Sequence, residues 1–172
     1  MKLESYITNV PNYPIEGIQF KDITTLLVDG AAFKEAIDKL AEFGRKLGAT
    51  VVMGPDARGF IFGCPVAYAL NVGFVPVRKP GKLPRKTISV SYELEYAKNT
   101  LEITYDAFKK GDKVLIVDDL MATGGTVEAA IQLAKMLGAE VVGVATLIEL
   151  TELKGKEKIG DIPFLSLIKY DI

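Results

Sequence analysis

The sequence Val114-Leu-Ile-Val-Asp-Asp-Leu-Met-Ala-Thr-Gly-Gly-Thr126 joins an apolar run to two acids and a loop of small residues. The run over 114–117 is continuous and mostly β-branched, which is typical of a strand buried on both faces of a parallel sheet. After the loop, apolar residues recur at helical spacing from Val127 to Leu137. The loop is therefore predicted between the carboxyl end of a strand and the amino end of a helix, where open α/β sheets bind ligands.

The small-residue loop has the features of a phosphate site. The free N–H groups and the dipole at a helix amino end attract anions, glycines let the backbone come close to one, and threonines add hydroxyl donors. The loop residues expected around the phosphate are Ala122, Thr123, Gly124, Gly125 and Thr126. Asp118 and Asp119 would repel a phosphate, so we expect them to bind sugar hydroxyls or a divalent cation. The segment therefore predicts a sugar-phosphate site, the alternative being an acid pair solvated at a strand end.

Two other phosphate-binding motifs are not supported. The segment Gly54-Pro-Asp-Ala-Arg-Gly59 has the glycine spacing of a P-loop, but Phe60 stands where that motif requires lysine. No Gly-x-Gly-x-x-Gly motif follows a predicted strand, which removes the main support for a dinucleotide-binding domain.

In the rest of the chain, segments with the apolar spacing of a helix alternate with short apolar runs typical of strands. Elements are predicted as helices over 31–47 and 59–70, as strands over 50–53, 73–77 and 140–148, and as a strand of a small antiparallel flap over 99–104. No internal repeat or low-complexity linker interrupts the 172 residues, so a single domain over 1–172 is expected. This alternation predicts an α/β fold with a mainly parallel, doubly wound sheet and helices on both faces.

Composition excludes several classes of protein. The chain has no histidine and one cysteine, Cys64, so histidine-based catalysis, zinc sites that need imidazole and an internal disulfide are all excluded. Acid–base work must fall to carboxylates, lysine or tyrosine. A metal ion, if used, should be one that prefers oxygen, such as Mg²⁺ arriving with a phosphate ligand.

Charge and hydropathy bear on partners and location. The net charge of −1 gives no field for nucleic acid, so no nucleic-acid partner is expected. The amino terminus lacks the apolar run of a secretory signal, and the longest apolar stretch, Val141 to Ile148, is too short to span a membrane. We therefore expect a soluble, cytoplasmic protein without a membrane partner.

The segment Arg78-Lys-Pro-Gly-Lys-Leu-Pro-Arg-Lys86 holds five cations in nine residues. Its prolines exclude a helix. A solvated surface loop and a mobile lid that brings cations to a phosphate-rich substrate both fit this composition. A nucleic-acid patch fits less well, because no aromatic residues lie among the cations.

The phosphate-loop segment resembles the phosphoribosyl-pyrophosphate (PRPP) motif of type I phosphoribosyltransferases. Other segments match, in order, the branch of that family that acts on adenine, and the resemblance covers nearly the whole chain. These segments are Gly17-Ile-Gln-Phe-Lys-Asp-Ile-Thr24, Ala57-Arg-Gly-Phe-Ile-Phe-Gly63, Val77-Arg-Lys-Pro-Gly-Lys-Leu-Pro84, Tyr92-Glu-Leu-Glu-Tyr96, Leu147-Ile-Glu-Leu150 and Leu165-Ser-Leu-Ile-Lys-Tyr170.

The resemblance implies a fold, a reaction and an assembly. It implies the type I phosphoribosyltransferase fold, with a small amino-terminal hood over about 1–30 and a mobile loop and antiparallel flap over about 78–104. The implied reaction converts adenine and PRPP into AMP and pyrophosphate, with Mg²⁺ carried by PRPP and pyrophosphate rather than held by protein side chains. The implied assembly is a homodimer, in which the mobile loop closes over pyrophosphate partly across the interface.

The resemblance also assigns roles to residues. Glu95 falls where the family has its catalytic glutamate, thought to exchange a proton with the adenine ring. The segment holding Phe20 and Lys21 is similar to the adenine contact, with Phe20 stacked on the base and Leu120 on its opposite face. The loop over 122–126 would cradle the 5′-phosphate, and the two acids would hold the ribose hydroxyls. Residues chosen for pyrophosphate, because guanidinium and ammonium groups suit phosphate oxygens, are Arg58, Arg78, Lys79 and Lys82.

Two departures and two rival functions stay open at this point. Ala97 stands where the family usually has glycine, and alanine would make the flap stiffer. Met121 replaces a leucine of similar volume. The rivals are a phosphoribosyltransferase for a 6-oxopurine and a regulator that binds PRPP without chemistry. The Phe20 and Glu95 segments argue against the first, and the lack of a basic DNA-binding helix argues against the second.

Overall fold

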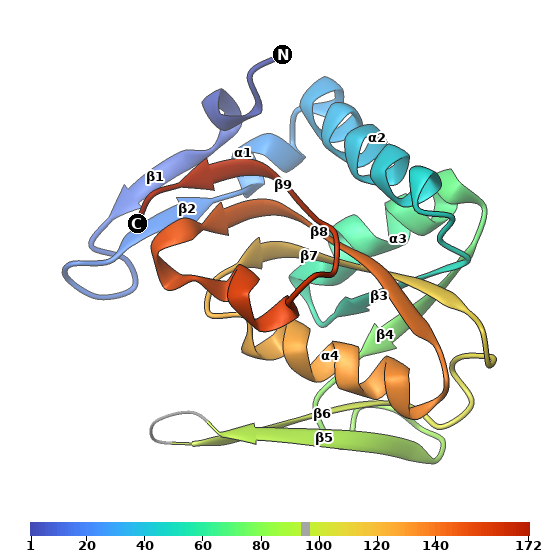
Figure 1. The fold of residues 1–172 in the computed structure, drawn as a ribbon. Helices are drawn as coiled ribbons and strands as arrows, with labels where there is room; N and C mark the ends of the chain where they lie inside the picture. The colour runs from blue at the N-terminus through green and yellow to red at the C-terminus, as the bar shows by residue number, and fades with distance from the viewer. Residues whose placement is uncertain (94–96) are drawn as a thin grey trace.

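The computed structural model describes residues 1–93 and 97–172, and its centre is a five-stranded parallel sheet (Figure 1). The strands lie in the order β4-β3-β7-β8-β9. Their bounds are β3 Val51–Pro55, β4 Gly73–Val77, β7 Lys113–Met121, β8 Glu140–Leu150 and β9 Phe164–Tyr170. The predicted α/β fold with a parallel, doubly wound sheet is confirmed.

The strand order creates a switch point between β3 and β7. From β3 the chain passes through α3 (Arg58–Leu70) to β4 on one side, whereas from β7 it passes through α4 (Gly125–Met136) to β8 on the other. Right-handed crossovers that run in opposite directions place their helices on opposite faces of the sheet. The connections that leave the carboxyl ends of β3 and β7 therefore diverge and leave a crevice between them, which is where such sheets bind ligands.

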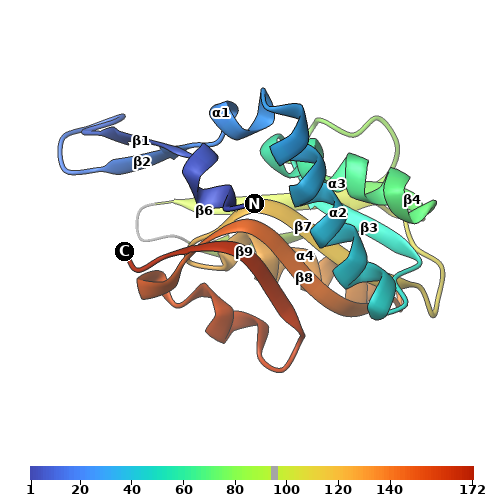
Figure 2. The ribbon, with the colours of Figure 1, turned by 90° about the horizontal axis from the view of Figure 1, so that it is seen from above.

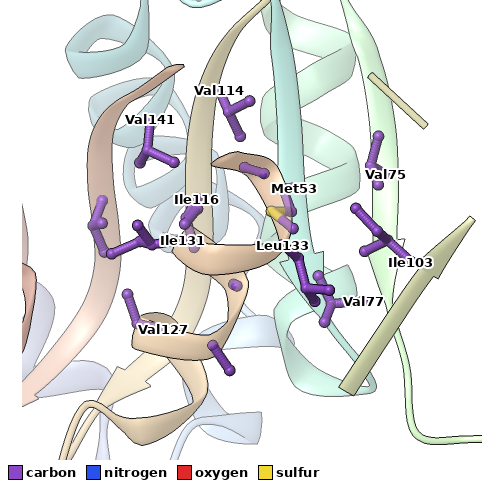
Figure 3. Close-up of a cluster of buried hydrophobic side chains, with 14 of the residues drawn as sticks. Met53, Val75, Val77, Ile103, Val114, Ile116, Val127, Ile131, Leu133 and Val141 are labelled. Carbon is purple, nitrogen blue, oxygen red and sulfur yellow. The ribbon is translucent and has the colours of Figure 1, made fainter. Parts of the chain in front are cut away.

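Each face of the sheet has its own core. On one face α4 packs against the central strands, with Val127 and Ile131 of the helix near Ile116 and Val141 of the sheet (Figure 3). The other face is covered by α1 (Thr24–Leu27), α2 (Gly30–Lys46) and α3. Burial of each large aliphatic side chain contributes about 1.5–3 kcal/mol, so two continuous cores hold the crevice rigid.

Helix α2 shows how local sequence sets these elements. It begins after Asp29, whose carboxylate accepts a hydrogen bond from the Ala32 N–H at 3.0 Å, and Arg45 and Lys46 lie in its last turn. Helices α2 and α3 begin at residues 30 and 58, one residue before the predicted starts.

Within the described ranges, no helix is both long enough and apolar enough to cross a membrane.

Two antiparallel hairpins extend the sheet core. The first pairs β1 (Thr8–Pro11) with β2 (Gln19–Asp22) and projects beyond the main sheet (Figures 1 and 2), with Lys21 of β2 near Tyr170 at the end of the carboxyl-terminal strand β9. The second pairs β5 (Thr87–Glu93) with β6 (Lys98–Thr104) under α4, and contains the strand predicted over 99–104. Short 3-10 helices complete the described part of the chain: η1 (Leu3–Tyr6), η2 (Thr151–Leu153) and η3 (Gly155–Ile159).

The structure corrects the predicted end of the central strand. We expected the strand to stop at Val117, but β7 continues to Met121 and pairs with β8 as far as Met121↔Glu149. Asp118 and Asp119 therefore lie within the strand rather than after it. Asp118 pairs with Thr146 of β8 and Leu120 pairs with Ile148, so polar side chains at this sheet edge do not end the strand.

Candidate active site

The acid pair lies at the end of β7, facing the first turn of α3. Asp119 is only 5% exposed, and the Nε atom of Arg58 lies 2.9 Å from its Oδ2 atom. The Oδ1 atom of Asp118 accepts a hydrogen bond from the Asp119 N–H at 2.8 Å. Burial raises the pKa of Asp118 well above its usual range, and the charge of Asp119 raises it further, while Arg58 opposes both. Titratable groups perturbed in this way are typical of ligand sites.

The predicted phosphate loop encloses a small cavity of about 80 Å³. The loop residues Ala122 to Thr126 line it together with Asp118, Leu120, Met121 and Val127. Gly124 has φ +88°, in the left-handed region, and stands just before the first residue of α4. Only glycine adopts this conformation without strain, so the turn that aims the free N–H groups of α4 into the cavity depends on it.

A residue of the β5–β6 hairpin also contacts this loop. The Tyr92 hydroxyl lies 3.2 Å from the Thr126 Oγ1 atom. The Tyr92 ring covers Gly125, where a Cβ atom would lie 3.2 Å from the ring. Tyr92 belongs to one of the segments that carry the resemblance, but no role was predicted for it. The signal available in the sequence was its position in that segment.

A second cavity, of about 410 Å³, lies between the end of β3, the segment after β4 and the β5–β6 hairpin. Its lining includes Lys79, Lys82, Tyr92, Asn99 and Thr126, together with Pro55, Asp56, Val77, Thr100 and Leu101. Two of the four residues predicted for pyrophosphate thus line one cavity, and Tyr92 and Thr126 place this cavity next to the phosphate loop.

The two predicted arginines lie differently. The Nε atom of Arg78 is 2.9 Å from the Asp56 Oδ2 atom, and its guanidinium also donates to the Lys82 carbonyl oxygen at 3.3 Å. Arg78 therefore ties the segment after β4 to the turn after β3. Arg58, paired with Asp119, lines a different cavity from Lys79 and Lys82. The structure does not bring all four cations to one wall.

The third cavity, of about 150 Å³, is mainly apolar. It brings together the three residues predicted for the base, Phe20, Lys21 and Leu120. The remaining lining residues are Ile18, Gln19, Ile23, Arg58, Asp119, Ile148 and Leu150. The Phe20 ring is held by an edge-on contact with Tyr13, with 5.2 Å between centroids. Sequence reasoning gave no role to Ile148 or Leu150, although their segment was among those that matched.

Lys21 lines this cavity, but its ammonium group contacts other protein side chains. Its Nζ atom donates to the Asn9 Oδ1 atom at 2.8 Å and lies 4.4 Å from the centroid of the Tyr170 ring. The ammonium group therefore joins β1, β2 and β9. Such a cation–π contact contributes roughly 0.5–1 kcal/mol at an exposed site, so Lys21 holds the amino-terminal hairpin over the cavity.

Glu95, the predicted catalytic residue, lies outside the described residues. The strands that precede and follow it in the sequence are β5 and β6, and these contribute Tyr92 and Asn99 to the cavity lined by Lys79 and Lys82.

The three cavities are neighbours through shared residues. Asp119 and Leu120 connect the acid pair to the apolar cavity, and Thr126 belongs to both the phosphate loop and the cation-lined cavity. An apolar slot, a carboxylate pair, an anion-binding loop and a cation-lined chamber thus follow one another along the sheet edge. This sequence of environments suits a flat base, ribose hydroxyls and phosphate groups.

Comparisons with known proteins agree with this arrangement. The family described as "Phosphoribosyl transferase domain" matches residues 24–170. The adenine phosphoribosyltransferase of Clostridium botulinum is 55% identical over 172 residues, covering 100% of both chains. The crystal structure of the enzyme of that name from Thermoanaerobacter pseudethanolicus has a TM-score of 0.93 at 48% identity, covering 98% of each chain. The Saccharomyces cerevisiae enzyme, solved with adenine and an imino-altritol bisphosphate, has a TM-score of 0.89 at 38% identity, covering 96% of each chain.

Proposed function

The chain belongs to the adenine phosphoribosyltransferase family, and from this premise we propose which of its residues transfer the 5-phosphoribosyl group of PRPP to adenine. The reaction yields AMP and pyrophosphate and is a step of purine salvage. The observation that carries the proposal is that the acid pair, the phosphate loop and the apolar cavity share residues at one edge of the sheet.

We assign the ribose phosphate to the phosphate loop and the acid pair. The N–H groups at the start of α4 and the Thr126 hydroxyl bind the 5′-phosphate. Asp118 and Asp119 bind the ribose hydroxyls. Displacement at the anomeric carbon passes through an oxocarbenium-like state, and two carboxylates beside the sugar stabilise its positive charge.

We assign the pyrophosphate to Lys79 and Lys82, supported by Arg78 and Arg58. The two lysines line one cavity beside the phosphate loop, and Arg78 fixes the segment that carries them. The Nε atom of Arg58 is held on Asp119, and the terminal nitrogens of the same guanidinium are the donors that we assign to pyrophosphate.

Mg²⁺ fits this site as an ion carried by the substrate. Among residues 1–93 and 97–172, no three His, Cys, Asp or Glu side chains group as metal ligands, whereas the carboxylates of Asp118 and Asp119 stand beside the phosphate loop. Mg²⁺ is commonly bound by one or two carboxylates together with phosphate oxygens. The phosphate oxygens of PRPP would carry the ion beside Asp118 and Asp119, which keep their role on the ribose hydroxyls. The ion would neutralise charge on the pyrophosphate.

The base is assigned to the apolar cavity, with adenine between Phe20 and Leu120. We expect Phe20→Ala to raise the KM for adenine about tenfold to a hundredfold, because base stacking contributes about 1–3 kcal/mol. The KM for PRPP should be nearly unchanged. Steady-state kinetics with each substrate varied in turn measures both values.

Matched variants separate stacking from bulk at this position. Phe20→Tyr keeps the ring and should stay close to the parent protein, whereas Phe20→Leu keeps only the apolar volume and should resemble Phe20→Ala. Equal increases in both KM values would mean that Phe20 is structural.

We further propose a homodimer, a cytoplasmic location and one domain over 1–172, with a hood over about 1–30 and a mobile loop and flap over about 78–104. Family membership supports the first two. The position of the β1–β2 hairpin beside the apolar cavity supports the proposed hood. The position of Lys79 and Lys82 beside the phosphate loop supports the proposed mobile loop.

The first experiment is AMP synthesis from PRPP and Mg²⁺, with adenine, hypoxanthine, guanine and xanthine supplied separately. Turnover with adenine alone is the expected result. Turnover with a 6-oxopurine would overturn the assignment of the apolar cavity while keeping that of the phosphate loop. PRPP binding without turnover of any base would indicate a regulator.

A further inference from the structure

The turn after β8 packs against the back of the phosphate loop. Gly155, the first residue of η3, is buried there. A Cβ atom on Gly155 would clash with the Ala122 carbonyl oxygen and would lie 3.1 Å from the Gly124 backbone nitrogen. From the other side, a Cβ atom on Gly124 would lie 2.7 Å from the Gly155 carbonyl oxygen. The two backbones therefore meet with no side chain between them.

Space, rather than backbone conformation, requires glycine at position 155. The φ angle of Gly155 lies outside the left-handed region, whereas Gly124 has φ +88° and Lys154 has φ +56°. Any residue can adopt the Gly155 conformation, so a side chain is excluded by the approach of Ala122 and Gly124 and of the Met121 Sδ atom, which would lie 2.9 Å from the Cβ atom.

The turn over 151–159 is held at both ends. At its start the Thr151 Oγ1 atom lies 2.6 Å from the Asp171 Oδ1 atom, to which it donates a hydrogen bond. At its end Ile159 is 4% exposed and packs into the core beneath α4. Because Gly124 and Gly155 are both buried and protein interiors are close-packed, a group added at position 155 pushes the turn and the phosphate loop apart.

We propose that Gly155 is a positioning residue that sets the affinity of the phosphate loop for the 5′-phosphate. The proposal rests on the function assigned above to this loop. A methyl group at position 155 moves the Ala122–Gly124 backbone away from the turn. The N–H groups at the start of α4 then miss the distance of about 2.7–3.2 Å at which they bind phosphate oxygens. The residues of the turn over 151–159 do not line the apolar cavity, so binding of the base is unaffected.

The test compares AMP with adenosine, which has the same base and sugar but lacks the 5′-phosphate. In Gly155→Ala the affinity for AMP should fall about tenfold to a hundredfold, as expected for one extra methyl group in a packed contact, with adenosine binding unchanged. The KM for PRPP should rise while the KM for adenine stays constant. Gly73→Ala is the matched control, since no atom lies within 4 Å of its Cβ position and its φ is not left-handed.

The outcomes separate this proposal from the proposed function. If the parent protein binds AMP no more tightly than adenosine, the phosphate role of the loop is wrong and the inference fails with it. If the parent protein prefers AMP and Gly155→Ala prefers it equally, only the inference about Gly155 is overturned.

A second variant covers the case in which Gly155→Ala does not fold. Thr151→Val removes the hydroxyl that anchors the turn and should weaken AMP binding about two- to tenfold without changing adenosine binding. Unchanged AMP binding in Thr151→Val would then overturn the proposal.

Discussion

Replacing Glu95 by glutamine is expected to lower kcat about 10²–10⁴-fold while leaving the affinity for PRPP nearly intact. The reaction needs a group that exchanges a proton with the adenine ring. The chain has no histidine, so a carboxylate is the group best suited to that task. Glutamine keeps the size and polarity of glutamate but cannot transfer a proton, so binding and turnover should separate.

Single-turnover kinetics together with PRPP titration measure the two effects of Glu95→Gln independently. Glu93→Gln and Glu102→Gln are the matched controls, because these acids lie in β5 and β6, the strands before and after Glu95 in the sequence, and the residues alone did not distinguish them from Glu95. Both controls should keep most of the turnover. Full turnover in Glu95→Gln would remove Glu95 from the mechanism, and a comparable loss in Glu93→Gln would show that the loss is not specific to Glu95.

Asp118→Asn is expected to lower kcat/KM about tenfold to a hundredfold and to raise thermal stability at neutral pH. The activity falls for two reasons. A hydrogen bond to an ionised carboxylate contributes about 1.5–3 kcal/mol, against about 0.5–1.5 kcal/mol for one to a neutral amide. The amide also lacks the negative charge that stabilises the developing positive charge on the sugar. The stability rises because burial and the charge of Asp119 raise the pKa of Asp118, which disfavours its ionised form in the folded protein. The amide oxygen can still accept the bond from the Asp119 N–H.

The raised pKa of Asp118 fixes the pH dependence of this stability difference. Well below the usual pKa of 3.8, Asp118 carries its proton in both the folded and the unfolded protein, and its contribution to the free energy of unfolding is fully present. As the pH rises towards the higher pKa of the folded state, the unfolded chain loses its proton first and the folded protein loses stability. The asparagine variant has no such loss, so its advantage should grow with pH and level off above the folded pKa.

Thermal unfolding of Asp118→Asn and the parent protein at a series of pH values tests this prediction. We expect a gain in Tm of about 2–4 °C at neutral pH, the change that 1 kcal/mol produces in a domain of this size, and a smaller gain in acid. Asp161→Asn serves as the control, since it removes the charge of an exposed carboxylate. A lower Tm for Asp118→Asn at neutral pH would contradict the proposed cost of the buried charge.

Long elements and the phosphate loop were predictable because their signals lie close together in the chain. Helices α2 and α3 were predicted to within one residue at each end, and β4 was predicted over its full range of 73–77. The hairpin β1–β2 and strands β5 and β9 were not predicted as elements. Their residues are mostly exposed or half-buried, so they lack the continuous apolar run that marks a central strand.

The sequence by itself determined the strand–loop–helix unit over 114–126, its two acids and the glycine at position 124, because contiguous residues form this unit. The tertiary structure decided which distant groups meet it: Arg58 on Asp119, Tyr92 on Thr126 and Gly155 behind Ala122. Contacts of this kind depend on strand order and on the packing of turns. Neither strand order nor turn packing can be predicted from the periodicity or composition of one local segment.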